Sequence, residues 1–191
     1  MWGKRNEIVE ELEELREKIL NYAKEIGQEA WFYPEYEEVL GFSGTQEIIF
    51  LGLNPSSGIF PSKRDRLFYN LLKNKGFEFA HITDFIKIRA KNKHITDLIV
   101  NSELMKKQTD FFSDELNNIK PKIIITMGNR CDNLLKQYFP KIDKCYNIFQ
   151  IKHYSYRYQS EESLFKEISD QLDKIKEEYK RLSKRKDVGE G

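Results

Sequence analysis

Along the chain, short runs of consecutive apolar residues alternate with longer segments in which apolar residues recur every three or four positions. The short runs predict buried strands, because a strand covered on both faces has little need for polar residues. Four such strands are expected, at residues 48–53, 79–88, 122–127 and 146–151. The longer segments predict amphipathic helices. Five are expected, at residues 7–26, 65–75, 102–119, 131–138 and 162–186.

Strands that alternate with helices favour a parallel sheet with helices on both faces. We therefore predict an α/β fold, a three-layer sandwich whose central sheet has about four mostly parallel strands, with flanking N- and C-terminal helices. A chain of 191 residues is long enough for one such domain and short for two. The prediction is a single domain over residues 1–191, with a helical extension at residues 1–46 and a charged helix at residues 161–186.

The net charge of +1 conceals an uneven distribution of charged residues. Residues 1–47 carry a net charge of −7, whereas residues 61–94 carry nine Lys or Arg and three acidic residues. A local excess of positive charge suits the phosphate backbone of a nucleic acid. A solvated basic surface without a ligand would have the same composition, so charge alone does not decide between the two.

Several classes of protein are disfavoured by what the sequence lacks. No run approaches the roughly 18 consecutive apolar residues of a membrane span, and the first residues lead into an acidic helical pattern rather than a signal peptide. The two cysteines, Cys131 and Cys145, cannot form a four-cysteine metal site. His81, His94 and Asp97 fit no known zinc spacing. We expect a cytoplasmic protein without a membrane segment, a metal or a cofactor.

Three loops of unusual composition each follow a predicted strand. They cover residues 54–60, 84–93 and 153–157. In parallel sheets, ligands bind at loops beyond the carboxyl ends of the strands. We therefore expect one cleft to collect side chains from all three loops.

Five sequence elements around these loops occur in a recognisable order. They are Gly52-Leu53-Asn54-Pro55, Phe60 followed by Arg66-Leu67-Phe68, the Thr-containing strand at residues 82–87, the Pro-strand-Gly element at residues 121–128, and His153-Tyr154-Ser155. In these elements the chain resembles the uracil-DNA glycosylase superfamily, and most closely its mismatch-specific uracil/thymine-DNA glycosylases. That group carries Gly-Ile-Asn-Pro-Gly after its first strand, and most families carry His-Pro-Ser as the second motif. The likeness covers about residues 47–160.

The departures from the family pattern fall on positions that face the substrate. Ser56 replaces the second glycine of the first motif, and Tyr154 replaces the proline of the second. Asp84 stands where several families carry an Asn that reads the base. The members with an iron–sulfur cluster need four cysteines, so this chain is not one of them.

The resemblance implies a monofunctional DNA glycosylase, which flips a uracil or another deaminated or mismatched base out of DNA and hydrolyses its bond to the sugar. Asn54 is expected to hold the attacking water, and His153 to stabilise the negative charge on the departing base. Phe60 is expected to stack on the flipped base. The other residues predicted to bind the base are Gly52, Leu53 and Asp84.

The expected partner is double-stranded DNA that carries a lesion, bound by a monomer. Polar and basic residues of the same loops are expected to contact the phosphates, and Arg157 could instead fill the gap left in the duplex. The predicted DNA-binding residues are Ser56, Ser57, Lys63, Arg64, Lys87, Arg89, Lys91, Ser155 and Arg157.

Structural roles are open for the same residues. Asn54 can simply shape an Asn-Pro turn, His153 can be a surface or capping residue, and Phe60 can belong to the core. Asp84 can be structural, or it can accept from a base edge that is rich in donors. A catalytically silent module that binds a base or a single-stranded end is therefore an alternative, and a scaffold whose terminal helices dock a partner is a third.

Overall fold

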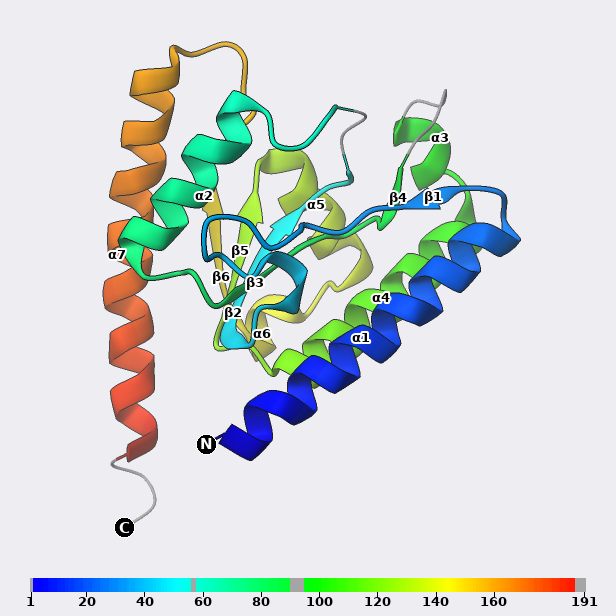
Figure 1. Cartoon of the computed structure of the whole chain (residues 1–191), viewed down its shortest axis with the longest axis horizontal. Coiled ribbons are helices and arrows are strands. Elements are labelled where there is room, and N and C mark those ends of the chain that lie inside the picture. Colours follow the sequence, from blue (N-terminus) through cyan, green and yellow to red (C-terminus); the bar gives the residue numbers. More distant parts are fainter. Residues whose placement is uncertain (1, 56–57, 90–94, 188–191) are drawn as a thin grey trace.

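A four-stranded parallel sheet forms the centre of the molecule (Figure 1). The computed structural model describes residues 2–55, 58–89 and 95–187. The strands of the sheet are β2 (Gln46–Gly52), β3 (Ala80–Asp84), β5 (Ile123–Met127) and β6 (Asn147–Ile151). They lie in the order β3-β2-β5-β6, and every neighbouring pair is parallel.

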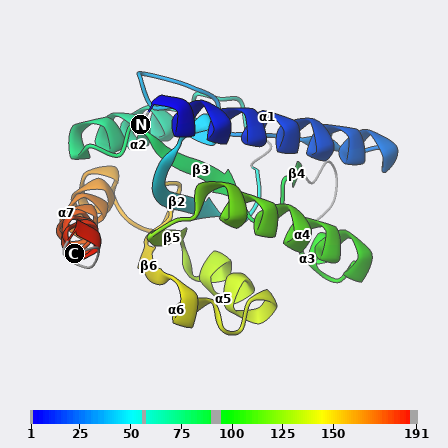
Figure 2. The same cartoon turned by 90° about the horizontal axis from the view of Figure 1, so that it is seen from below.

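Helices cover both faces of this sheet (Figure 2). On one face lie α1 (Trp2–Glu25), α4 (Ser102–Ile119) and α5 (Asn129–Tyr138). On the other lie α2 (Lys63–Lys75) and the long helix α7 (Glu161–Asp187). The predicted three-layer α/β sandwich with flanking terminal helices is confirmed.

The middle of β2 is apolar because both of its faces are covered. Ile48 and Phe50 of β2 pack in the cluster that contains α2 and α7, whereas Ile49 and Leu51 pack in the cluster that contains α1, α4 and α5. All four side chains are fully buried. Successive side chains of a strand point to opposite faces of the sheet. Because helices cover both faces here, both sets of alternating positions are apolar.

The predicted strand at residues 79–88 is wrong in its second half. β3 ends at Asp84, and the chain bends there because the N–H groups of Phe85 and Ile86 donate to the carbonyl oxygens of Gly52 and Leu53. It then forms the short strand β4 (Ile88–Arg89), which pairs antiparallel with β1 (Glu29–Ala30) in a separate two-stranded sheet. The bend places Arg89 beside the N-terminal segment.

Helix α2 starts earlier than its apolar pattern predicts because Ser62 caps it. The Ser62 side chain accepts from the Asp65 N–H, and the Asp65 carboxylate accepts from the Ser62 N–H, which is a complete capping box. Gly76 ends the helix with a φ of 78°, a conformation that favours glycine. Three short helical elements were not predicted: η1 (Gly41–Ser43), α3 (Ile95–Ile99) and α6 (Ile142–Cys145).

Candidate active site

A cleft of about 550 Å³ opens beyond the carboxyl ends of the central strands. In the sheet, β3 lies on one side of β2 and β5 lies on the other. The connection that leaves β2 leads towards β3, and the connection that leaves β5 leads towards β6, so the loops after β2 and β5 run in opposite directions and leave a crevice between them. The cleft is lined by residues from the loop after β2, the start of α2, the segment after β6, β4 and the N-terminal segment. Asn54, Phe60 and His153 all line it, as the sequence predicts.

Asn54 presents an acceptor to the cleft. It lies two residues after the end of β2 and is partly buried. Its Nδ2 donates to the carbonyl oxygen of Pro55 at 3.1 Å. With the amide nitrogen engaged in the turn, Oδ1 is the atom that can accept a hydrogen bond from a water or ligand in the cleft. The turn-shaping role and the water-holding role are therefore compatible in one side chain.

His153 is held as a neutral imidazole. Its Nδ1 accepts from the Ser155 N–H at 3.1 Å and lies 2.8 Å from the Ser155 hydroxyl oxygen. A backbone N–H can only donate, so Nδ1 carries no proton and the ring proton belongs on Nε2. Burial lowers the pKa of His153 to about 4, although Asp65 acts in the opposite direction. At neutral pH the ring therefore offers an uncharged N–H donor to the cleft.

Tyr154 fixes the plane of that ring. The Tyr154 ring stacks on Phe68 of α2, with centroids 4.4 Å apart, and the His153 ring stacks on Tyr154 at 4.8 Å. The buried Tyr154 hydroxyl hydrogen-bonds to Tyr33 and to Asp65. The tyrosine that departs from the His-Pro-Ser pattern thus anchors the loop after β6 to α2.

Phe60 belongs to an aromatic cluster at the edge of the cleft. Its ring centroid lies 5.5 Å from Tyr69, 5.7 Å from Tyr36 and 6.1 Å from Trp31. The side chain is only partly buried, and it lines the cleft. Packing on one side and exposure on the other are compatible with both a core role and a stacking role.

Two cations of the first turn of α2 are tied to the segment that follows β6 and to the first residue of α7. Lys63 Nζ lies 2.6 Å from Glu161 Oε1, and Arg64 Nη1 donates to the carbonyl oxygen of Tyr156 at 2.5 Å. Both cations line the cleft. Lys63 is 76% exposed, so a phosphate can replace its carboxylate partner at little cost.

Three other predicted DNA-binding residues also line the cleft. Arg89 lies over the Trp31 ring, 5.6 Å from its centroid, and its Nη1 is 3.4 Å from Glu29 Oε1. Ser155 and Arg157 are exposed at the mouth. The cleft therefore brings together five of the predicted DNA-binding residues; that they contact DNA stays a prediction. Ser56, Ser57 and Lys91 lie outside the described residues.

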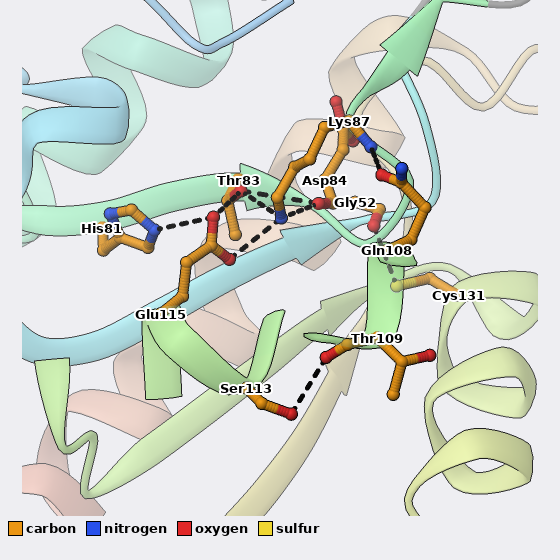
Figure 3. A network of polar contacts seen from close by, with 10 residues as sticks. All are labelled: Gly52, His81, Thr83, Asp84, Lys87, Gln108, Thr109, Ser113, Glu115 and Cys131. Atoms are coloured by element: carbon orange, nitrogen blue, oxygen red, sulfur yellow. Dashed lines mark hydrogen bonds and ion pairs between the residues drawn. The ribbon is translucent and has the colours of Figure 1, made fainter. Parts of the chain in front are cut away.

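The prediction that Lys87 contacts DNA is wrong. Its side chain is only 1% exposed, in a buried polar network (Figure 3). Its Nζ donates to Thr83 Oγ1 and Glu115 Oε2, both at 2.9 Å, and to the carbonyl oxygen of Asp84. Burial alone would raise the pKa of Glu115, but Lys87 and His81 outweigh it and the pKa is lowered. Lys87 is the counter-charge of a buried carboxylate, so it is not available to a phosphate.

Gly52, Leu53 and Asp84 are not among the residues that line the cleft, and their contact with a base stays a prediction. Gly52 is buried, and an added Cβ would lie 2.1 Å from Asp84 Oδ1, so only glycine fits. Leu53 packs against the core. Asp84 is 3% exposed, and neither carboxylate oxygen has a hydrogen-bond partner in the described part of the chain (Figure 3).

Asp84 nevertheless acts on the residues around the cleft through its charge. Burial raises its pKa to about 7, with Lys87 lowering it and Glu115 raising it further. The Asp84 carboxyl and the Tyr33 hydroxyl both lie beside Gly52. A Cβ added at Gly52 would be 2.1 Å from Asp84 Oδ1 and 3.3 Å from the Tyr33 hydroxyl oxygen, and burial together with the charge of Asp84 raises the pKa of Tyr33. Tyr33 is a cleft residue, so Asp84 lies behind the wall of the cleft.

Several residues of the cleft were not predicted from the sequence, and three of them are large and apolar or aromatic side chains of its walls and mouth. Trp31 and Tyr33 come from the segment after β1, and Ile59, which is 91% exposed, stands at the mouth beside Phe60. The aromatic run at residues 31–33 is visible in the sequence, but nothing in its pattern places it at the ends of the strands.

Comparison with known protein families shows the family to which the chain belongs. A model of the uracil DNA glycosylase superfamily matches residues 41–179, which include β2, β3, β5, β6 and the loops that carry Asn54, Phe60 and His153. The chain belongs to the uracil-DNA glycosylase superfamily. This is a superfamily of DNA glycosylases. The match establishes the resemblance at the level of the superfamily. No curated protein matches the chain.

Two further properties bear on the superfamily's chemistry in this chain. Among the described residues, no group of three or more His, Cys, Asp or Glu is arranged to hold a metal ion. No described helix is long and apolar enough to cross a membrane. In this member of the superfamily, the cleft offers an amide oxygen, a neutral imidazole, aromatic rings and cations to a ligand.

Proposed function

We propose that the protein is a monofunctional DNA glycosylase that removes uracil, or another deaminated or mismatched base, from DNA. The observation that carries this proposal is the meeting of Asn54 and a neutral His153 in one cleft beside Phe60. Superfamily membership supports it. The motif Gly52-Leu53-Asn54-Pro55, with an amide where other families carry a carboxylate, favours the mismatch-specific uracil/thymine group.

The reaction is a displacement at the anomeric carbon. The bond between C1′ and the base nitrogen breaks, its electron pair leaves with the base, and a water oxygen forms the new bond to C1′. Asn54 Oδ1 accepts a hydrogen bond from that water and orients it, while His153 Nε2–H donates to the base carbonyl on which negative charge develops. The proton released by the water ends on solvent or on the departing base. An amide is a poor base, so we expect a slow enzyme.

Extraction of the base from the duplex precedes this step. Unstacking costs a few kcal/mol, and stacking on an aromatic ring such as Phe60 returns about 1–3 kcal/mol. The exposed Ile59 and Arg157 stand at the mouth, where a group can occupy the space the base leaves. We propose that a monomer acts on the duplex.

The contribution of His153 to the rate of base release should be nearly independent of pH above about 5 and fall as pH drops through about 4, separate from any step near pH 7 that comes from Asp84. Protonation at Nδ1 would break the bond from Ser155 that orients the ring. A histidine whose folded pKa lies below its unfolded value of about 6.5 also destabilises the fold as pH falls through that range. Single-turnover rates between pH 4 and pH 8 test this. An acid limb centred near 6.5 that is lost in His153→Ala would show that the pKa of His153 is not lowered by burial.

Affinity for a duplex should fall steeply with salt, because cations that contact phosphates release condensed counterions. The slope of log affinity against log salt should be about −0.9 per phosphate contact. Replacing Arg157 by Gln should reduce that slope by about one. Lys75→Gln, at the far end of α2 and paired with Asp173, is the matched control. Equal slopes for the parent and Arg157→Gln would remove Arg157 from the DNA-binding surface.

The proposed activity is tested with duplexes that carry one uracil, hypoxanthine, xanthine or mismatched thymine. A monofunctional glycosylase leaves an intact abasic strand that breaks only after alkali. Breakage without alkali would indicate a lyase, and no breakage for any base in the presence of binding would favour the silent binding module.

A further inference from the structure

The N-terminal segment around Trp31 builds one wall of the cleft, although it lies outside the residues matched by the superfamily model. β1 fixes the segment by pairing with β4. The Trp31 N–H donates to the Lys87 carbonyl oxygen at 3.1 Å, which extends the backbone pairing between the N-terminal segment and the chain before β4 by one hydrogen bond. The position of the segment is therefore set by backbone hydrogen bonds to the chain that leaves the central sheet.

Successive side chains of this extended segment point to different environments. Trp31 is partly buried and lines the cleft. Phe32 packs against Phe42, with centroids 4.7 Å apart, and under the Arg16 guanidinium. The alternation is that of a strand, so Trp31 is presented to the cleft by the same geometry that directs Phe32 to the core.

Trp31 and Phe60 form an aromatic corner. Their ring centroids are 6.1 Å apart and their planes are inclined by 55°. Rings at this angle cannot sandwich a planar ligand between them. A planar base that stacks on one ring instead meets the other ring with its edge, and both arrangements are favourable for aromatic pairs.

A cation lies over one face of the Trp31 ring and leaves the other face for a base. Arg89 lies 5.6 Å from the centroid of the Trp31 ring, in the range of a cation–π contact. Arg89 is also a cleft residue. A base placed against Trp31 therefore comes with its phosphate near a cation, as stacking platforms for nucleic acids require.

We propose that Trp31 is a nucleobase-binding residue of this enzyme, and that the flipped base lies in the corner formed by Trp31 and Phe60. This inference rests on the proposed glycosylase function and assigns the binding of its substrate to a residue outside the family-matched region. It predicts that the N-terminal segment is part of the site and not only a structural extension.

Fluorescence tests the contact directly, without requiring turnover. The sequence contains two tryptophans, so Trp2→Phe leaves Trp31 as the single reporter. The probe is a duplex with one 2′-fluoro-2′-deoxyuridine, a nucleotide that resists hydrolysis, and the reference is the same duplex with thymidine paired to adenine. Stacking should quench the Trp31 emission with the fluorinated duplex and much less with the reference.

A pair of substitutions in adjacent positions provides the control. Trp31→Leu should weaken binding of the fluorinated duplex about tenfold. Trp31→Phe should retain most of the affinity because it keeps a stacking ring. Phe32→Leu, one residue away and directed to the core, should leave the affinity within about twofold of the parent once thermal unfolding shows that it is folded.

The outcomes separate this inference from the proposed function. Cleavage of uracil by the parent, with Trp31 emission unchanged on binding or with Trp31→Leu binding as the parent does, overturns the inference and leaves the glycosylase proposal intact. Quenching and loss of affinity in a protein that cleaves no base would support the base-binding role of Trp31 and overturn the glycosylase proposal.

Discussion

Replacing His153 by alanine is expected to lower the single-turnover rate of base release by about 10²–10³-fold. The neutral imidazole, held by the Ser155 N–H at Nδ1, presents its Nε2–H to the carbonyl of the departing base. The charge on that carbonyl is largest in the transition state, so the lost interaction slows the reaction more than it weakens binding. Rapid-quench measurement of base release, with DNA affinity followed in parallel, gives both quantities.

Asn54→Ala should behave in the same way, since its amide oxygen orients the attacking water and grips no phosphate. Asn147→Ala is the matched control. Asn147 is the first residue of β6, and its exposed amide donates a hydrogen bond to the Lys122 carbonyl oxygen. The control should cleave at the parent's rate. If Asn54→Ala and His153→Ala also cleave at that rate, the catalytic roles assigned to them are wrong.

Replacing Lys87 by methionine is expected to destabilise the fold by about 3–5 kcal/mol at neutral pH. Methionine keeps much of the volume of lysine but leaves the fully buried Glu115 without the ammonium group that lies 2.9 Å from its Oε2. Asp84 loses the same neighbouring charge. Urea unfolding of the parent and the variant at pH 7 measures the difference in the free energy of unfolding.

A second substitution distinguishes an unpaired charge from a packing defect. Lys87→Met combined with Glu115→Gln removes both charges and should recover much of the lost stability. The stability that Lys87→Met loses relative to the parent should also shrink as pH falls towards 4. At that pH Glu115 can accept a proton in both the folded and the unfolded variant, so no unpaired charge is buried on folding. A double variant no more stable than the single one would show that packing, and not the buried ion pair, accounts for the loss.

The sequence predicts the central architecture well because β2 and β5 are covered on both faces. Consecutive apolar residues at 48–51 and 123–125 leave few alternatives to a buried parallel strand, and helix α4 was predicted at its observed bounds. The two-residue strands β1 and β4 were not predictable in this way. Two residues carry no periodicity, and their pairing depends on a bend set by backbone bonds to Gly52 and Leu53.

The candidate site was predictable where it follows a strand and not where it depends on distant segments. Asn54, Phe60 and His153 meet because parallel strands end on the same edge of the sheet. Lys87 was predicted to contact phosphates because it is a basic residue of the loop at residues 84–93. The contrary signal lies in Glu115, an acidic residue among the apolar positions of α4, which indicates a buried cationic partner. Trp31 reaches the cleft through a contact that no local pattern encodes.

The most direct test of the central claim is to identify the released product. A duplex with a single uracil is incubated with excess protein, and free base and abasic sites are quantified by mass spectrometry for the parent and for Asn54→Ala combined with His153→Ala. We expect free uracil in equal molar amount to abasic sites from the parent and almost none from the double variant. Release of no base by the parent from duplexes carrying uracil, hypoxanthine, xanthine or mismatched thymine would contradict the central claim.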